Sequence, residues 1–156
     1  MSDIRKVAIL ALSVIVTVPI AAQEHSSASV AAETAQFKKE RRQLIADNLQ
    51  LTDTEAKDFW PIYDRLEQDI TVMLNKRTRI IAEFGENYDQ MTDDMARKLL
   101  MDYMNLEEQR TQLWKTYFKK FEKVLPIKKL ARYYQIESKI RAFVDAGIAE
   151  EIPLIK

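Results

Sequence analysis

Residues 51–68 read LTDTEAKDFWPIYDRLEQ and combine a helix start with an internal proline, Pro61. Thr52 and, three residues later, Glu55 form a predicted capping box, in which each side chain accepts a hydrogen bond from a backbone amide at the helix start. A proline inside a helix removes one backbone hydrogen bond and crowds the preceding turn, at a cost of about 3 kcal/mol. The question is therefore whether the helix ends at Pro61 or continues through it.

The apolar residues after Thr52 form one stripe at helical spacing on both sides of Pro61, without a change of phase. The stripe consists of Ala56, Phe59, Trp60, Tyr63, Leu66, Ile70, Met73, Leu74, Ile81 and Phe84. A helix that stopped and restarted would have little reason to keep this phase. We therefore predict one helix from about residue 53 to residue 84, with a kink at Trp60 and Pro61.

Three more helices are predicted, at residues 36–48, 92–125 and 126–147. Gly85 and the segment ENYDQ predict the end of the preceding helix, and Thr92 followed by two aspartates predicts the next start. Pro126 suits the start of the last helix, where its missing amide costs nothing. The core face of the third helix is predicted to contain Met95, Leu99, Tyr103, Leu106, Leu113, Trp114, Tyr117, Phe121 and Val124.

The composition favours an all-α fold, because 2 glycines and 4 prolines in 156 residues are too few for a turn-rich β-protein. Two of the predicted helices are much longer than the other two. Long helices with short partners leave apolar surface uncovered, so we expect an elongated four-helix hairpin with two long helices that forms a homodimer.

The first 22 residues have the pattern of a secretory signal peptide. Arg5 and Lys6 precede the apolar run VAILALSVIVTVPI, which is shorter than the roughly 20 residues that span a bilayer. Cleavage near Ala22 is expected, with an uncleaved membrane anchor as the alternative. The expected organisation is a signal peptide at 1–22, a flexible leader at 23–34, an α-helical domain at 35–150 and an apolar C-terminal tail at 151–156. Export of a chain without cysteine is compatible with the periplasm of a Gram-negative bacterium.

Few residues could carry chemistry. The chain has no cysteine and a single histidine, His25, so neither a thiol nucleophile nor a zinc site of the usual composition can be built. No glycine-rich loop is present to hold phosphate. We therefore expect no enzyme activity, cofactor or metal. The alternative is copper(I) held by the thioethers of Met91, Met95, Met101 and Met104.

Helical geometry argues against the copper site, because Met95 falls on the core stripe whereas Met101 and Met104 project away from it. Met101 and Met104 are better interpreted as an adaptable apolar surface. Charge is also unevenly distributed: residues 115–132 hold seven basic residues against one acid, and residues 83–108 hold eight acids against two bases. The candidate surface residues are Met101, Met104, Lys119, Lys120, Lys123, Lys128, Lys129 and Arg132.

The uneven charge permits several interpretations. It could be a solvated face, or complementary surfaces that pair two chains antiparallel, or a basic apolar surface that attracts unfolded acidic segments. Binding of single-stranded nucleic acid is a further possibility in principle, but an exported protein rarely meets it, so no nucleic-acid partner is expected. Stable membrane insertion is not expected after removal of the signal peptide.

The sequence resembles the Spy and CpxP family of periplasmic stress proteins, whose hallmark is a repeated LTxxQ motif at helix starts. The motif is represented by LTDTE, with Leu51, Thr52 and Glu55, and by MTDDM, with Met91, Thr92 and Met95. The two copies are 40 residues apart, and both fall at predicted helix starts. Glu55 and Met95 stand where the family has glutamine, and Met91 stands where it has leucine.

The resemblance covers roughly residues 36–144 and implies a thin, cradle-shaped antiparallel homodimer, which the Pro61 kink would help to curve. It implies a periplasmic, ATP-independent chaperone that acts as a holdase for unfolded envelope proteins during the envelope stress response. The alternative is a regulatory adaptor that binds the periplasmic domain of an envelope-stress sensor. A zinc-binding role within the family does not transfer, because the histidines that it needs are absent.

Overall fold

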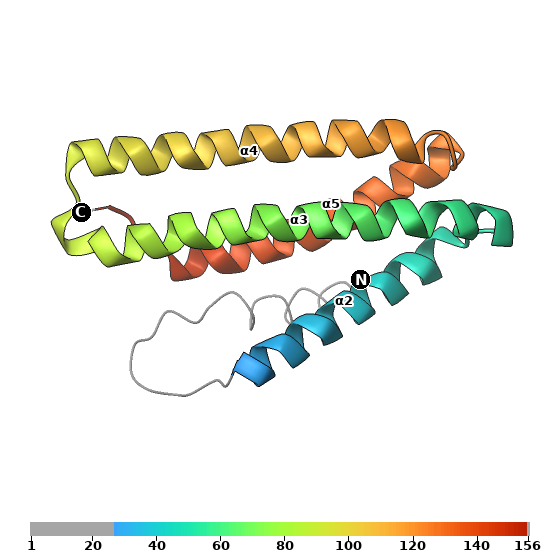
Figure 1. Ribbon diagram of the computed structural model, residues 1–156, viewed down its shortest axis with the longest axis horizontal. Helices are drawn as coiled ribbons and strands as arrows, with labels where there is room; N and C mark the ends of the chain where they lie inside the picture. Colours follow the sequence, from blue (N-terminus) through green and yellow to red (C-terminus); the bar gives the residue numbers. More distant parts are fainter. Residues whose placement is uncertain (1–26, 156) are drawn as a thin grey trace. The chain divides into compact units, whose positions relative to one another are not determined.

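The computed structural model describes residues 27–155, with side chains from residue 32 onward (Figure 1). This part of the chain is all-α and contains no strand. Its elements are α2 (Ser27–Leu49), α3 (Asp53–Asn87), the 3-10 helix η1 (Tyr88–Gln90), α4 (Asp93–Phe121) and α5 (Ile127–Glu151). The predicted signal peptide at 1–22, the first part of the predicted leader and His25 lie outside the described residues.

The described residues form two units. We call residues 52–130, with Ile155, the α3–α4 unit, and residues 27–51 with 131–154 the α2–α5 unit. The first turn of α5 belongs to the α3–α4 unit and the rest of α5 to the α2–α5 unit.

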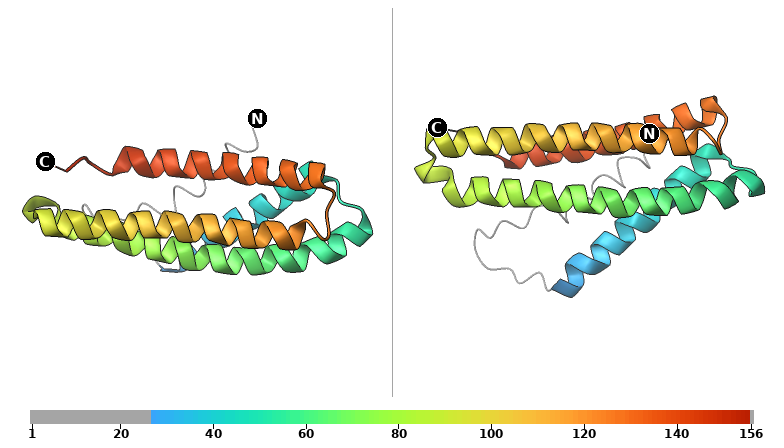
Figure 2. Two further views of the ribbon diagram at one scale, coloured as in Figure 1. Left: turned by 90° about the horizontal axis from the view of Figure 1, so that it is seen from above. Right: turned by 45° about the horizontal axis from the view of Figure 1, so that its top comes forward.

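The α3–α4 unit is an antiparallel helical hairpin that turns at η1, as both Figure 1 and Figure 2 show. Its core is densest near the start of α3 and the end of α4, where the Phe59 and Phe121 ring centroids lie 5.1 Å apart. Full burial of each large apolar side chain stabilises the fold by about 1.5–3 kcal/mol. The buried apolar residues of this unit are Phe59, Tyr63, Leu66, Leu99, Leu106, Tyr117, Phe121, Leu125 and Leu130.

Helix α3 continues through Pro61, as the unbroken apolar phase predicted. Phe59 and Tyr63, on either side of the proline, are buried, and their rings stack with centroids 5.9 Å apart. Burial of these two rings offsets the cost of about 3 kcal/mol for a proline inside a helix. The kink at Trp60 and Pro61 stays a prediction.

Two predicted helix boundaries are wrong. Helix α3 does not stop at Gly85 but runs to Asn87, where the backbone amide of Tyr88 donates to the Gly85 carbonyl. Glycine lowers helix propensity by about 1 kcal/mol, which does not end a helix whose neighbours remain hydrogen-bonded. Helix α2 begins at Ser27 and so includes residues assigned to the leader. Alanine-rich residues in that stretch favour a helix even without an apolar stripe.

The ends of the last two helices also differ from the prediction. Helix α4 ends at Phe121 rather than at Leu125, but the Leu125 amide still donates to the Phe121 carbonyl at 2.8 Å. Helix α5 starts directly after Pro126, as predicted, and continues past Gly147 to Glu151.

A buried ion pair joins the two helices of the α2–α5 unit. The Arg41 guanidinium donates to both carboxylate oxygens of Glu137, and both residues are buried. Apolar residues flank the pair on each helix, and Ile45 and Tyr133 are fully buried. Removal of one partner of such a pair leaves an uncompensated buried charge, which costs about 3–5 kcal/mol. The pair therefore ties α2 to α5 strongly.

Candidate binding surface

Four large apolar residues near the middle of α4 are exposed rather than buried. We call Leu100, Met101, Tyr103 and Met104 the α4 apolar surface; their exposed fractions are 59, 51, 41 and 55%. Residues three or four apart are neighbours on a helix, so Met104 lies next to both Leu100 and Met101. Contiguous exposed apolar residues of this kind mark interaction sites on soluble proteins.

The α4 apolar surface exists because other positions of the helix supply the core. Leu99 and Leu106 are buried and hold α4 in the unit, which leaves Met101 and Met104 directed outward as predicted. Tyr103 was assigned to the core stripe, and this prediction is wrong. By helical angle it occupies the same position as the buried Phe121, five turns later, so its exposure depends on what packs against this part of α4 and not on its place in the stripe.

The lysines at the end of α4 and the start of α5 form a second region. Lys115, Lys119, Lys120, Lys123 and Lys128 are all exposed. Lys120 is held over the Tyr117 ring, with its ammonium 4.1 Å from the ring centroid. The Tyr117 hydroxyl donates to Asp69 at 2.6 Å, and burial, followed by this carboxylate, raises the pKa of Tyr117 to about 12. Tyr117 therefore stays protonated and links α4 to α3.

Lys129 is placed differently from the other lysines. Its ammonium donates to the Glu55 carboxylate at 2.5 Å, while the same carboxylate accepts from the Thr52 amide at 2.8 Å. The Thr52 hydroxyl in turn accepts from the Glu55 amide, which completes the predicted capping box. The hydrogen bond from Lys129, with that from the Thr52 backbone, lowers the pKa of Glu55. Lys129 can reach a partner only by leaving this ion pair.

Within the α3–α4 unit, the predicted surface residues lie in two separate regions of the chain. Met104 and Lys119 point away from the core of the same helix, but the helical rise of 1.5 Å per residue separates them by about 22 Å along its axis. Arg132 is exposed on α5 and belongs to the α2–α5 unit. The structure therefore resolves the predicted set into an apolar surface in the middle of α4 and a lysine-rich region at its end.

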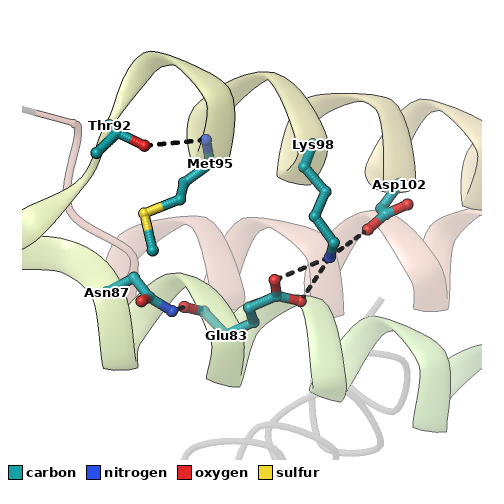
Figure 3. Close-up of polar contacts among 6 residues, drawn as sticks. All are labelled: Glu83, Asn87, Thr92, Met95, Lys98 and Asp102. Atoms are coloured by element: carbon teal, nitrogen blue, oxygen red, sulfur yellow. Dashed lines mark hydrogen bonds and ion pairs between the residues drawn. The ribbon is translucent and has the colours of Figure 1, made fainter.

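The segment MTDDM, residues 91–95, lies at the start of α4, whereas the lysine-rich region lies at the end of this helix. Figure 3 shows the contacts of the segment. The Thr92 hydroxyl accepts from the Met95 amide at 3.3 Å, so Thr92 caps α4 as predicted. Met95 cannot return a hydrogen bond, and its side chain points from α4 toward α3. Helix α4 therefore has a threonine N-cap but not a complete capping box.

Lys98 joins the two helices at this end. Its ammonium donates to both oxygens of Glu83, at 2.8 and 2.9 Å, and to Asp102 at 3.0 Å. These carboxylates, Glu83 first, raise the pKa of Lys98. Sequence reasoning missed this contact, because acids at the hairpin end were treated only as a net charge.

No family model, curated protein or solved structure matches the chain. Among the described helices, none combines the length and the apolar character needed to cross a membrane.

Proposed function

We propose that this protein is a periplasmic, ATP-independent holdase that binds unfolded envelope proteins, works as a homodimer and has no enzyme activity. The observation that carries the proposal is the α4 apolar surface, where four large apolar side chains lie exposed within five consecutive residues. Burial of exposed apolar area contributes about 25 cal/mol per Å², so unfolded segments with exposed apolar side chains gain by covering this surface.

The composition of the surface suits many clients rather than one. Met101 and Met104 carry flexible, polarisable side chains, which adapt to apolar partners of different shape. The exposed lysines further along α4 raise the encounter rate with acidic segments by long-range attraction. Added salt should therefore slow capture more than it speeds release.

Light scattering tests the proposal. A chemically unfolded model protein is diluted with and without this protein, purified without residues 1–22 and in the absence of ATP. We expect aggregation to be suppressed near one dimer per client, and a sizing column with light-scattering detection to give the mass of two chains. The double variant Met101→Ser with Met104→Ser should need several-fold more protein for the same suppression.

The matched control replaces two exposed aromatic residues of the α2–α5 unit, Tyr134→Ser with Phe143→Ser. This control should suppress aggregation like the unsubstituted protein. Absence of suppression at several-fold excess would reject a general holdase and favour the adaptor, which binds a single folded sensor domain. Equal loss in both double variants would reject the α4 apolar surface as the client site.

A further inference from the structure

The end of the hairpin where α4 passes into α5 combines positive charge with exposed apolar side chains. Phe118 and Ile127 are 41 and 57% exposed, although both are large and apolar. Exposed lysines stand beside them in the chain. We call this region the basic tip, and it consists of Lys115, Phe118, Lys119, Lys123, Ile127 and Lys128.

The lysines of the basic tip have no carboxylate partner within residues 27–155 at salt-bridge distance. Glu122 is the only acid between residues 115 and 132, and it is exposed. The positive charge of this region is therefore not neutralised within the described part of the chain. It stands out because the whole chain has a formal net charge of zero.

The helix dipole accounts for the position of one lysine of the basic tip but not of another. Lys119 lies in the last turn of α4, where the helix dipole favours a positive charge. Lys128 lies in the first turn of α5, where the dipole disfavours it, and that turn contains no acid. Lys129, in the same turn, is compensated by Glu55, whereas Lys128 is not. The helix dipole therefore does not favour the charge of Lys128, and no carboxylate in the first turn of α5 compensates it.

We propose that the basic tip binds the surface of a lipid bilayer that contains anionic phospholipids. Lysine ammonium groups would contact lipid phosphates, while Phe118 and Ile127 enter the boundary between headgroups and acyl chains. Each lysine near an anionic bilayer contributes about fivefold to the partition coefficient. The protein would lie on the membrane without spanning it.

The composition of the tip favours a bilayer over a protein partner. Protein–protein interfaces are depleted of lysine and enclose an apolar core, whereas this region has four lysines around two apolar side chains. A bilayer presents many phosphates on a deformable surface, so it needs no shape complementarity. The inference goes beyond client binding, because the α4 apolar surface lies at least about 16 Å from the basic tip along the helix axis and stays free.

Sedimentation with vesicles tests the inference. The protein is used without residues 1–22, which could bind lipid themselves, and this leaves the described fold complete. We expect it to sediment with vesicles of phosphatidylglycerol mixed with phosphatidylcholine, but not with pure phosphatidylcholine. The triple variant Lys119→Gln, Lys123→Gln and Lys128→Gln should lower the partition coefficient on the order of 100-fold.

A matched triple variant, Lys76→Gln, Arg79→Gln and Arg97→Gln, removes the same charge from exposed positions toward the η1 end. Its partition coefficient should stay within about twofold, because charges beyond the Debye length of about 8 Å are screened. Replacement of Phe118 and Ile127 by serine should weaken binding several-fold while the lysines remain. Circular dichroism of each variant checks that the helices are intact.

Three outcomes would overturn the inference. The protein could fail to sediment with anionic vesicles, or the two triple variants could bind them equally. The tip variant could also lose binding to a soluble acidic protein while vesicle binding is absent, which would assign the lysines to a protein partner. Retained suppression of aggregation in the variant with serine at Phe118 and Ile127 would separate this result from the holdase proposal, since client binding as proposed uses neither residue.

Discussion

At the scale of single residues, Glu55 takes part in two interactions at the start of α3. A glutamine at this position would complete the capping box, but only a carboxylate can also form an ion pair with Lys129. The capping box could be predicted from the sequence, because its two residues are three apart. The ion pair could not, because its partners are 74 residues apart and meet only in the folded chain.

Replacement Glu55→Gln should destabilise the protein at neutral pH and lose its effect in acid. Lys129 and the Thr52 amide lower the pKa of Glu55 in the folded state below its ordinary value of 4.5. The carboxylate therefore contributes stability that is fully present above pH 4.5 and is lost as the pH falls through the folded pKa. Urea unfolding at a series of pH values measures the difference between the two proteins, which should shrink below pH 4.5.

Replacement Thr52→Ala provides the comparison, because it removes the cap but leaves the Glu55 charge in place. Loss of a threonine N-cap costs about 1 kcal/mol. If Glu55→Gln were equally destabilising at pH 7 and in acid, the ion pair with Lys129 would contribute nothing to stability in solution.

At the scale of elements, the sequence signals differed in strength. Hydrogen-bonding residues at helix starts were reliable: Thr52 and Thr92 both cap a helix as predicted. Continuity through Pro61 was also predicted correctly, because apolar phase on both sides reflects packing that outweighs one lost hydrogen bond. Gly85 was misread, because low helix propensity is a weak signal beside side-chain capping.

Replacement Gly85→Ala should stabilise the protein by about 0.5–1 kcal/mol. Gly85 is exposed inside α3, and an added Cβ atom would meet nothing within 4 Å. The substitution therefore reduces the conformational entropy of the unfolded chain without a clash. Urea unfolding followed by circular dichroism measures the change.

The matched control for this substitution is Ala82→Gly, at an exposed position one turn earlier in α3. It should destabilise the protein by about 0.5–1 kcal/mol. A destabilising effect of Gly85→Ala would mean that α3 ends before this residue in solution, as the sequence had suggested.

At the scale of the whole molecule, the sequence predicted which side chains of α4 would be exposed better than it predicted the contacts between distant parts of the chain. Apolar phase identified Met101 and Met104 as lying off the core, and both are exposed. It did not show that Lys129 would form an ion pair with Glu55, which lies 74 residues earlier in the chain. Contacts between distant parts of the chain depend on how the helices pair, which local periodicity does not contain.

Division of the chain into two units leads to a test with two spectroscopic signals. Both tryptophans, Trp60 and Trp114, lie in the α3–α4 unit, whereas circular dichroism reports every helix. Replacement Arg41→Met leaves Glu137 as an uncompensated buried charge in the α2–α5 unit, at a cost of about 3–5 kcal/mol. We expect the urea transition followed by circular dichroism to begin earlier in this variant, while the tryptophan transition moves less.

The double variant Arg41→Met with Glu137→Met distinguishes loss of the ion pair from loss of packing. Apolar residues of similar volume in place of a buried ion pair are often neutral or stabilising, so the double variant should recover most of the stability lost by the single one. If both signals shifted together in the Arg41→Met variant, the two units would unfold as one cooperative structure. Loss of the Arg41–Glu137 ion pair would then destabilise the α3–α4 unit as much as the α2–α5 unit, and the expected difference between the circular dichroism and tryptophan transitions would not be observed.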